Sequence, residues 1–396
     1  MSTDQPRSLY LATEAEIKAG LTTDVYFERA VEIIRATGTD RPVRAEFTAK
    51  TLPHGADWGI FAGLDEVVAV LAGRRVDVRA VPEGSVFHPY EPVMEIRGSY
   101  LEFAGLETAI LGLICQSSGV ATKAARIRRL AGERVVASFG ARRAHPAIAP
   151  VIERAAYVGG CDGVSVVKAA RILGADPTGT MPHSLILLMG DTVEAALAYD
   201  RVLPASLPRI VLVDTFNDEK FEAVRVAEAL GERLWGVRLD TPSSRRGDFR
   251  RIVQEVRWEL DLRGFQHVRI IVSGGLDEVD IVALRDLVDA FGVGTSIASA
   301  STIDFAMDIV EIDGKPIAKR GKLSGAKELW RCPASAQDWV LPLGELPPDA
   351  ECVDGDRPER MLRPLLQAGQ LVAELPPARD VRAYVLTQLQ TLPPPA

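Results

Sequence analysis

Hydrophobic and polar positions follow one pattern up to about residue 106 and a different pattern after it. In the first part, three short runs show strand-like alternation: residues 43–50, 75–84 and 92–98. Residues 64–73 have helical spacing, as do two stretches nearer the N-terminus, one opening with a capping box at residues 13–16 and one ending near Gly38. This part therefore predicts a mixed α/β domain with a mainly antiparallel sheet.

The second part begins with residues 106–132, which are helical in spacing and apolar on most faces, so we expect a buried helix. Seven β-branched runs follow: residues 134–140, 157–166, 180–188, 209–216, 233–240, 268–275 and 290–298. Amphipathic segments such as residues 218–231 separate several of them. This alternation predicts βαβ units and a parallel sheet, and seven strands without a clear break favour a closed barrel over an open sheet.

The alternation stops beyond residue 301, where a basic, turn-rich stretch at residues 312–331 precedes a proline-rich tail. A chain of 396 residues exceeds the usual size of a single hydrophobic core, so several domains are expected. We predict three: an N-terminal mixed α/β domain over 1–110, an α/β barrel over 111–300, and a C-terminal segment over 301–396 that packs on the N-terminal domain.

Composition narrows the class of protein. Hydrophobic residues make up 47% of the chain, and 46 Lys and Arg against 54 Asp and Glu give a net charge of −8. This balance argues against a general binder of nucleic acid or membrane surfaces. Residues 1–10 do not have the pattern of a signal peptide, and we expect the apolar stretches to be too short or too interrupted to cross a bilayer. The sequence thus predicts a cytoplasmic protein without nucleic-acid or membrane partners.

The chain has four cysteines, Cys115, Cys161, Cys332 and Cys352, and no CxxC pair. So few cysteines in a long chain indicate a reducing compartment rather than a disulfide scaffold. The lack of a CxxC pair argues against a four-cysteine zinc site, so we assign no metal-ligating cysteines.

Chemically distinctive residues collect at the carboxyl ends of the predicted barrel strands. Strand by strand, they are Phe139 with Arg142 and Arg143, Asp162, His183, Asp214 with Thr215, Arg238 with Asp240, Ser273 with Gly274 and Gly275, and Gly294 with Thr295. In a parallel barrel these ends form one mouth, where such folds carry out their chemistry. Seven consecutive ends of this kind predict a binding site rather than seven solvated turns.

The residue types indicate the ligand. Small residues in the last two loops let backbone N–H groups approach an anion, and the two arginines after Phe139 match phosphate or carboxylate. Asp214 and Asp240 offer acceptors for ribose hydroxyls or for the shell of a magnesium ion. Together with a ring that could stack on a planar group, these residues predict a phosphorylated sugar and a flat, anionic ring as substrates.

Eight short motifs make the family recognisable: TTDVYF, FGARRAHP, GGCDGVS, GTMPHSL, VDTFND, VRLDT, VSGGLDE and FGVGTS. In this order, from about residue 20 to residue 330, the chain resembles the nicotinate phosphoribosyltransferase family. The resemblance implies a type II phosphoribosyltransferase fold, an irregular parallel α/β barrel flanked by a mixed α/β domain built from both ends of the chain. It also implies a homodimer with active sites at the subunit interface.

The resemblance implies a reaction of nicotinate with phosphoribosyl pyrophosphate, giving nicotinate mononucleotide and pyrophosphate for NAD biosynthesis. ATP hydrolysis is coupled to it, and Mg²⁺ accompanies the pyrophosphate. His183 matches the histidine that ATP phosphorylates, and Asp214 an acid close to that histidine and the pyrophosphate. Phe139 resembles the ring that stacks on nicotinate, and Tyr26 the aromatic residue that the partner subunit supplies to the other face.

The remaining roles carry over position by position. Arg238, near the pyridine and phosphate groups, is assigned to catalysis together with His183 and Asp214. Those assigned to substrate binding are Arg142 near the same groups, Asp240 on the ribose, Ser273, Gly274 and Gly275 beside the ribose, Gly294 and Thr295 at the 5′-phosphate, and Asp162 near the base. The chain departs from many relatives at Phe216 and Asn217, where a tyrosine and an acid are expected. Because only Cys332 and Cys352 remain near the C-terminus, we predict no zinc.

Four other interpretations stay open at this point. Asp162 could accept a hydrogen bond from an amide, as in a nicotinamide phosphoribosyltransferase. A quinolinate phosphoribosyltransferase would need cations for two carboxylates. A barrel lyase or epimerase acting on a sugar phosphate usually needs a lysine or acid base at a strand end, and a sensor of phosphoribosyl pyrophosphate would bind without turnover.

Overall fold

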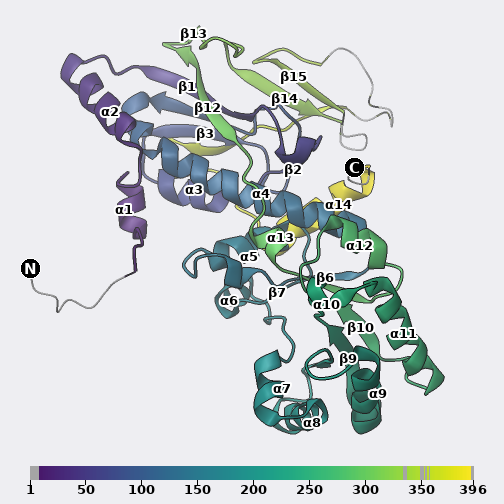
Figure 1. Ribbon diagram of the computed structural model, residues 1–396. Coiled ribbons are helices and arrows are strands. Elements are labelled where there is room, and N and C mark those ends of the chain that lie inside the picture. Colours follow the sequence, from purple (N-terminus) through teal and green to yellow (C-terminus); the bar gives the residue numbers. More distant parts are fainter. Residues whose placement is uncertain (1–8, 333–336, 348–351, 353–354, 356, 394–396) are drawn as a thin grey trace, which may run out of the picture. The chain divides into compact units, whose positions relative to one another are not determined.

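The computed structural model describes residues 9–332, 337–347, 352, 355 and 357–393 (Figure 1). The chain forms two compact units, each made of two separate segments: residues 1–119 with 301–377, and residues 120–300 with 378–396. The boundary after Gly119 differs from the predicted boundary after residue 110, and residues 378–396 belong to the second unit rather than packing on the first. Residues 1–8, in the segment tested for a signal peptide, and the last three residues of the proline-rich tail lie outside the described residues.

The first unit contains a seven-stranded antiparallel sheet in the order β13–β12–β1–β5–β3–β17–β18. Its strands are β1 (Pro42–Ala49), β3 (Val76–Ala80), β5 (Met94–Ser99), β12 (Phe305–Ile312), β13 (Lys315–Pro316), β17 (Arg363–Gln367) and β18 (Gln370–Leu371). In β1, Ala45, Phe47 and Ala49 are fully buried, as period-two alternation requires of a strand with one face on a core. The predicted antiparallel sheet is confirmed.

Smaller elements complete the first unit. They are helices α1 (Glu14–Lys18), α2 (Val25–Thr37) and α3 (Leu64–Leu71), the sheet of β15 (Asp338–Pro342), β14 (Lys327–Arg331) and β16 (Glu359–Arg360), and the pair β2 (Gly59–Ile60) and β4 (Val86–Phe87). The capping box forms between Thr13 and Glu16, and α2 ends at Gly38, whose φ of 64° is left-handed.

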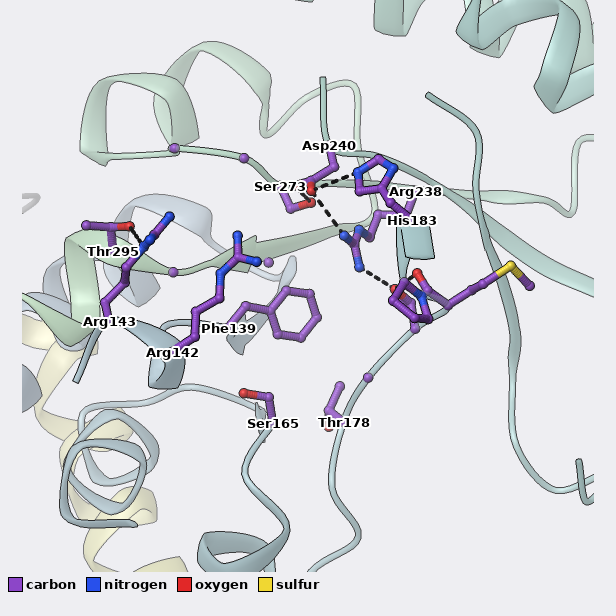
Figure 2. A pocket seen from close by; sticks show the side chains of 18 of the residues that line it. Phe139, Arg142, Arg143, Ser165, Thr178, His183, Arg238, Asp240, Ser273 and Thr295 are labelled. Atoms are coloured by element: carbon purple, nitrogen blue, oxygen red, sulfur yellow. Dashed lines mark hydrogen bonds and ion pairs between the residues drawn. The ribbon is translucent and has the colours of Figure 1, made fainter. Parts of the chain in front are cut away.

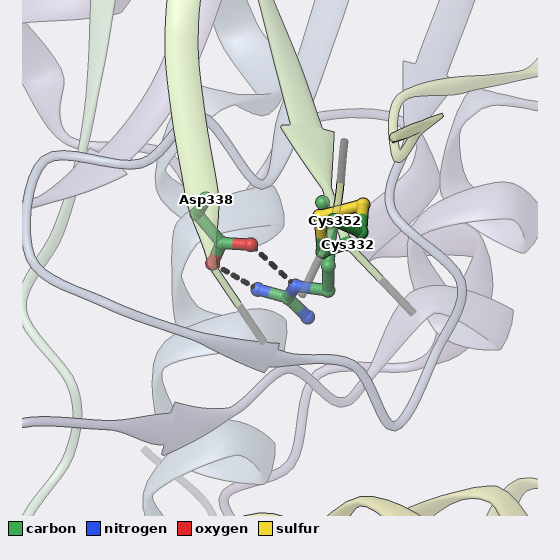
Figure 3. Close-up of a disulfide and its surroundings, with 4 residues drawn as sticks. Cys332, Asp338 and Cys352 are labelled. Carbon is green, nitrogen blue, oxygen red and sulfur yellow. Dashed lines mark hydrogen bonds and ion pairs between the residues drawn. A yellow bond between two sulfur atoms is a disulfide. The ribbon is translucent and has the colours of Figure 1, made fainter. Parts of the chain in front are cut away.

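A disulfide joins Cys332 and Cys352 (Figure 3), so the expectation of unpaired cysteines was wrong for this pair. Both cysteines are buried. Beside the bond, Arg331 at the end of β14 donates to both carboxylate oxygens of Asp338 at the start of β15, at 2.7 and 2.6 Å. A covalent bond and a bidentate ion pair thus hold this hairpin, whereas Cys115 and Cys161 remain thiols.

Helix α4 (Glu107–Ala131) is the long apolar helix expected from the sequence. By length and composition alone, the helical region Tyr100–Ala131 is apolar enough to cross a membrane, contrary to the expectation that no stretch would be. Half of its most apolar window is buried inside the structure, which is how the core helix of a folded protein also behaves.

The second unit contains six parallel strands in the order β7–β6–β11–β10–β9–β8. They are β6 (Val135–Ser138), β7 (Gly163–Val164), β8 (Arg209–Leu212), β9 (Leu234–Leu239), β10 (Arg269–Val272) and β11 (Ala290–Val293). The sheet curls into a half-barrel whose edge strands are β7 and β8, which is consistent with the predicted fold class of an irregular α/β barrel with a mixed α/β unit. The closed barrel favoured from the sequence is not formed by the described strands, because β7 and β8 do not pair. The barrel has six described strands instead of the seven expected.

Helices connect the barrel strands. They are α5 (Ala149–Val158), α6 (Val167–Leu173), α7 (His183–Met189), α8 (Thr192–Val202), α9 (Glu219–Leu230), α10 (Ser243–Arg246), α11 (Phe249–Leu262), α12 (Glu278–Leu284), α13 (Thr295–Ala298) and the C-terminal α14 (Ala378–Thr391). The main core lies between helices and strands and includes Val211 and Val237, whereas Ile210 and Ile271 face the other side of the sheet. Because both faces are largely buried, most strand positions are apolar, and the exceptions include Arg238 near the end of β9.

Two predicted strands were wrong in part. Residues 180–188 were expected to form a strand, but α7 begins at His183 after the extended Pro182 and ends at Gly190, whose φ is 79°. Within this run Met181 and Ile186 are fully buried, whereas Leu188 is 86% exposed. In residues 157–166, only Gly163–Val164 forms a strand, and the start of the range belongs to α5.

Candidate active site

A cavity of about 570 Å³ lies at the carboxyl ends of the barrel strands (Figure 2). Its walls come from every strand end except that of β8: Phe139, Arg142, Arg143, Ser165, Thr178, Gly179, Thr180, Met181, Pro182, His183, Ser184, Arg238, Asp240, Ser273, Gly274, Gly275, Gly292, Gly294 and Thr295. The size suits a small ligand, and the predicted mouth of the barrel is therefore the place where the predicted residues meet.

The wall after β6 carries the aromatic ring. Phe139 donates its backbone N–H to the carbonyl of Val293 at 2.8 Å, which extends the β6–β11 pairing by one residue. Its ring lies directly against Gly292, where a Cβ atom would come within 2.4 Å of a ring carbon. The Arg238 guanidinium carbon is 5.8 Å from the ring centroid. The ring thus lies between a bare backbone and a cation, at the wall of the cavity.

Two arginines follow the ring on the loop after β6. Arg143 donates from Nε to the Thr295 hydroxyl at 3.3 Å, so it links this loop to the start of α13. Arg142 also lines the cavity, and within the described residues it has no hydrogen bond or ion pair. Its guanidinium is therefore available to an anionic ligand.

Arg238, Asp240 and Ser273 form a hydrogen-bonded row across β9 and β10. Arg238 Nη2 donates to Asp240 Oδ2 at 3.2 Å, and Ser273 Oγ donates to Asp240 Oδ1 at 2.7 Å. Arg238 Nη1 also donates to the hydroxyl of Thr180. Gly274 has φ of 88°, and a Cβ there would lie 2.9 Å from the Asp240 carbonyl oxygen. The close backbone contact keeps this acid in place and requires glycine.

His183 stands at the first position of α7 with its ring 41% exposed. Nδ1 lies 3.1 Å from the hydroxyl of Thr215. Nε2 lies 3.5 Å from Asp240 Oδ2 and 3.9 Å from Asp214 Oδ1. One ring nitrogen is thus held by a hydroxyl while the other faces two carboxylates, so the imidazole is oriented and reachable from the cavity.

Asp214 follows β8 and is buried, with a side chain only 2% exposed. Neither of its carboxylate oxygens has a hydrogen-bond partner in the described part of the chain. Burial raises the pKa of Asp214 to about 6; the neighbouring Asp240 also raises it, and His183 opposes the shift. Orphaned buried oxygens next to a second carboxylate are hard donors of the kind that Mg²⁺ prefers, so these residues fit a magnesium ion held with a diphosphate.

Asp162 does not line the cavity, contrary to its predicted role near the base. One carboxylate oxygen accepts from Arg128 at 2.7 Å and from the Val136 N–H at 2.8 Å, and the other pairs with Arg382 at 2.5 Å. The cause is the length of β7: because this strand begins only at Gly163, Asp162 lies at its start and not at its end. The cavity residue that follows this strand is Ser165.

Other predicted residues fall as expected or stay untested. Gly275, Gly294 and Thr295 line the cavity. Tyr26 lies on α2 in the first unit and is 59% exposed, so its predicted contribution to a partner's site stays a prediction. Sequence reasoning missed Ser165 and Thr180, since a single serine or threonine in a loop carries no distinctive pattern.

A second polar cluster lies in the first unit and consists of His88, Glu91 and Asp338, whose ligand atoms are all within 4.8 Å. His88 Nδ1 is 3.3 Å from an oxygen of each acid, and hydrogen bonds to Asp338 and Glu91 raise its pKa to about 9. Arg331 also binds Asp338. In the structure, the cluster and Arg331 form a network of hydrogen bonds and ion pairs.

The chain matches two family models. The quinolinate phosphoribosyl transferase N-terminal domain matches residues 24–118, and the C-terminal domain of the same name matches residues 120–308. The junction between the two matches coincides with the break between compact units after Gly119.

Named relatives identify the family more closely. Nicotinate phosphoribosyltransferase pncB1 of Mycobacterium tuberculosis is 32% identical over 422 residues, which covers 95% of this chain and 91% of the relative. The chain belongs to the nicotinate phosphoribosyltransferase family. Members of this family are transferases.

Two solved structures resemble the chain along almost its whole length. A structure titled nicotinate-nucleotide pyrophosphorylase from Pyrococcus furiosus is 52% identical, with a TM-score of 0.94, covering 98% of this chain and 99% of that one. Human nicotinic acid phosphoribosyltransferase, at 24% identity and a TM-score of 0.76 with 94% of both chains covered, shares the fold.

Proposed function

We propose that the chain transfers the phosphoribosyl group of phosphoribosyl pyrophosphate to nicotinate, forming nicotinate mononucleotide and pyrophosphate for NAD biosynthesis. The observation that carries this proposal is the meeting of the stacked Phe139, the unpaired Arg142 and the row Arg238–Asp240–Ser273 in one cavity. A ring, a cation and ribose-sized acceptors side by side match a pyridine carboxylate next to a phosphoribosyl group.

In this proposal the nicotinate nitrogen attacks the anomeric carbon as the bond to pyrophosphate breaks. Phe139 holds the ring plane, and Arg142 pairs with the carboxylate. Positive charge develops on the ribose, and the Asp240 carboxylate, fixed by Ser273 and Arg238, is placed to stabilise it. The backbone after β11, at Gly294 and Thr295, would bind the 5′-phosphate.

Asp214 and Asp240 would hold Mg²⁺ with the diphosphate, since both carboxylates lie within 4 Å of the same His183 nitrogen. The ion, when bound, neutralises charge on the leaving pyrophosphate. Asp214 contributes oxygens that no protein group has already engaged in the described residues.

We further propose that ATP phosphorylates His183. The ring nitrogen attacks the γ-phosphorus, a nitrogen–phosphorus bond forms and ADP leaves; water later hydrolyses this bond and releases phosphate. In this step Nε2, which faces the two carboxylates, attacks with its lone pair, and the proton of the neutral ring is carried on Nδ1 beside the Thr215 hydroxyl. Because Thr215 fixes the ring, the phosphoryl group would stay beside the diphosphate site and couple ATP hydrolysis to turnover.

Arg142, which has no hydrogen bond or ion pair in the described residues, is our assigned partner for the single carboxylate of nicotinate. Quinolinate carries two carboxylates and would also need Arg143, whose Nε is directed to the Thr295 hydroxyl. Nicotinamide carries none, and Asp162, its predicted partner, is engaged by Arg128 and Arg382 away from the cavity. Quinolinate remains the second candidate substrate, because both matching family models are named for quinolinate phosphoribosyl transferase.

The deciding experiment is a product assay with phosphoribosyl pyrophosphate and Mg²⁺, comparing nicotinate, nicotinamide and quinolinate with and without ATP. Nicotinate mononucleotide from nicotinate, increased by ATP, supports the proposal. If carbon dioxide is released and product forms only with quinolinate, the protein is a quinolinate phosphoribosyltransferase instead. If His183→Ala is stimulated by ATP as strongly as the wild type, the proposed phosphorylation of His183 is wrong.

The proposed assembly is a homodimer with shared active sites. Two helices expose apolar side chains that a second copy could cover: Val25, Tyr26 and Ile33 on α2, and Leu187 and Leu188 on α7. If Tyr26 completes the partner's site, inactive Tyr26→Ala and His183→Ala protomers should complement each other when co-expressed. Random pairing gives mixed dimers with one intact site, or about a quarter of wild-type activity.

We place this reaction in the cytoplasm, as expected from the sequence. The support is the class of the relatives, which are named for a reaction on small metabolites. Cell fractionation followed by the same product assay tests the location.

A further inference from the structure

Glu153 on α5 is a carboxylate without a counter-ion. Its side chain is fully buried, and no Lys, Arg or His is paired with it in the described part of the chain. Burying a charged group without compensation is strongly unfavourable, so a carboxylate in this position must be satisfied by hydrogen bonds.

Donors from two strand ends supply those bonds. The Ser138 hydroxyl donates to Oε1 at 2.6 Å. The backbone N–H groups of Ser165 and Val166 donate to Oε2 at 2.6 and 3.3 Å, and the Ser165 hydroxyl lies 3.4 Å from the same oxygen. One carboxylate thus joins the last residue of β6 to the turn that follows β7.

Both ends form walls of the cavity. Ser138 immediately precedes Phe139, whose ring lies against Gly292, and Ser165 itself lines the cavity. The strands are neighbours, with Ser138 paired to Val164. A group that fixes Ser138 and Ser165 together therefore fixes the distance between the aromatic ring and the opposite polar wall.

We propose that Glu153 is a positioning residue for the base subsite: by binding Ser138 and Ser165 from behind the wall, it sets the width of the slot that receives the planar ring of the base. The assignment to a base rests on the proposed function, whereas the positioning of Phe139 and Ser165 does not. Glu153 touches no substrate and acts only through these two residues.

The chemistry of the donors predicts how substitutions rank. Backbone N–H groups can only donate, whereas a serine hydroxyl can donate or accept. Glutamine can therefore keep its oxygen on Ser165 and turn its amide toward Ser138, so Glu153→Gln should retain the slot. Alanine leaves all of these donors unsatisfied and removes the link between the strand ends.

Steady-state kinetics on wild type, Glu153→Gln and Glu153→Ala test this, with whichever base the wild type uses. In Glu153→Ala the KM for the base should rise about tenfold, as expected when a buried hydrogen-bonded link is lost, while the KM for phosphoribosyl pyrophosphate changes less than about twofold. Glu153→Gln should stay within about threefold of wild type for both substrates.

The matched control is Asp289→Ala. This carboxylate accepts the Ile270 N–H at 2.8 Å at the amino end of the same sheet, so its loss weakens the barrel without touching the cavity. If Asp289→Ala raises the base KM as much as Glu153→Ala does at equal loss of Tm, Glu153 is merely structural.

Crystal structures of wild type and Glu153→Ala separate this inference from the proposed function. A displaced Phe139 ring and Ser165 turn support the positioning role even if nicotinate proves to be the wrong base. Unmoved side chains together with an unchanged base KM would overturn it.

Discussion

Among single residues, Asp214 shows how stability and function oppose each other in this barrel. Its orphaned oxygens and raised pKa mean that the folded state is destabilised by this carboxylate's charge. A protein keeps such a group when a ligand satisfies it. Because the folded pKa of about 6 lies above the ordinary 3.8, the unfavourable contribution is absent below about pH 3.8 and complete above about pH 6.

Asp214→Asn should therefore raise Tm at neutral pH while lowering kcat/KM by about a hundredfold or more, since the amide cannot replace a carboxylate beside Mg²⁺. In the wild type, kcat/KM should fall as the pH drops below about 6. Calorimetry and pH–rate profiles measure both effects, and a variant that is less stable than wild type would contradict this account.

Gly292→Ala tests how tightly the aromatic ring is placed. The new Cβ would lie 2.4 Å from the Phe139 ring, so the ring must move. We expect the KM for the base to rise about tenfold or more, because a small displacement of a group that positions the substrate causes a large loss of binding and rate. Gly112→Ala in α4, where a Cβ would meet nothing within 4 Å, is the control and should leave kinetics unchanged.

Single residues also show where sequence reasoning reached its limit. His183, Arg238 and Asp240 were predicted correctly to share one site, because motif residues at successive strand ends must converge at a barrel mouth. Asp162 was misplaced because its position depends on where a two-residue strand begins. No local pattern fixes such a boundary, since register is decided by pairing with a neighbouring strand.

At the level of elements, α7 was misread for a general reason. A short apolar run between a proline and a glycine is compatible with either a strand or a helix, and periodicity over so few residues does not separate them. The β14–β15 hairpin posed a different difficulty: a disulfide across a sequence separation of 20 depends on the folding of the intervening chain, which no spacing rule describes.

Loss of the disulfide should lower stability without changing the site. Linking residues across about 20 positions is worth about 3 kcal/mol in the chain-entropy description. We expect the two variants, Cys332→Ser and Cys352→Ser, to lower Tm to the same extent as each other, because each removes the same bond. The values of kcat and KM should be retained at moderate temperature. Treatment of wild type with a reductant should reproduce the shift, and the double variant should be insensitive to reductant.

The ion-pair network of the same hairpin gives a pH signature. The folded pKa of His88, about 9, lies above its ordinary 6.5, so its stabilisation is complete below about pH 6.5 and disappears as the pH rises through 9. The Tm difference between wild type and His88→Gln should therefore shrink across this interval. A difference that stays constant from pH 6.5 to 9 would show that His88 does not titrate as described.

On the scale of the whole molecule, the fold class followed from the change of periodicity near residue 106, and the family from its motifs. The membership of α14 did not follow, because a terminal amphipathic helix can pack on any apolar surface. It belongs to the barrel unit, where Arg382 binds Asp162 and Arg129 binds the carbonyl of Leu392.

Asp162→Asn checks this assignment. Removing the charge leaves Arg128 and Arg382 without their carboxylate partner, and we expect about 2 kcal/mol of lost stability with an unchanged KM for the base. Urea unfolding and kinetics with nicotinate and nicotinamide provide the readouts. A selective change in base preference would restore the original assignment of Asp162 to the base.

The division of each unit into two segments has a consequence for synthesis on the ribosome. Residues 301–377, which belong to the first unit, must emerge before α14 can reach the barrel. During synthesis, the surface of the barrel unit that α14 covers therefore stays exposed until α14 has been made. The sheet of the first unit stays incomplete until β12, β13, β17 and β18 have been made. Neither unit can complete its packing before nearly the whole chain has been translated.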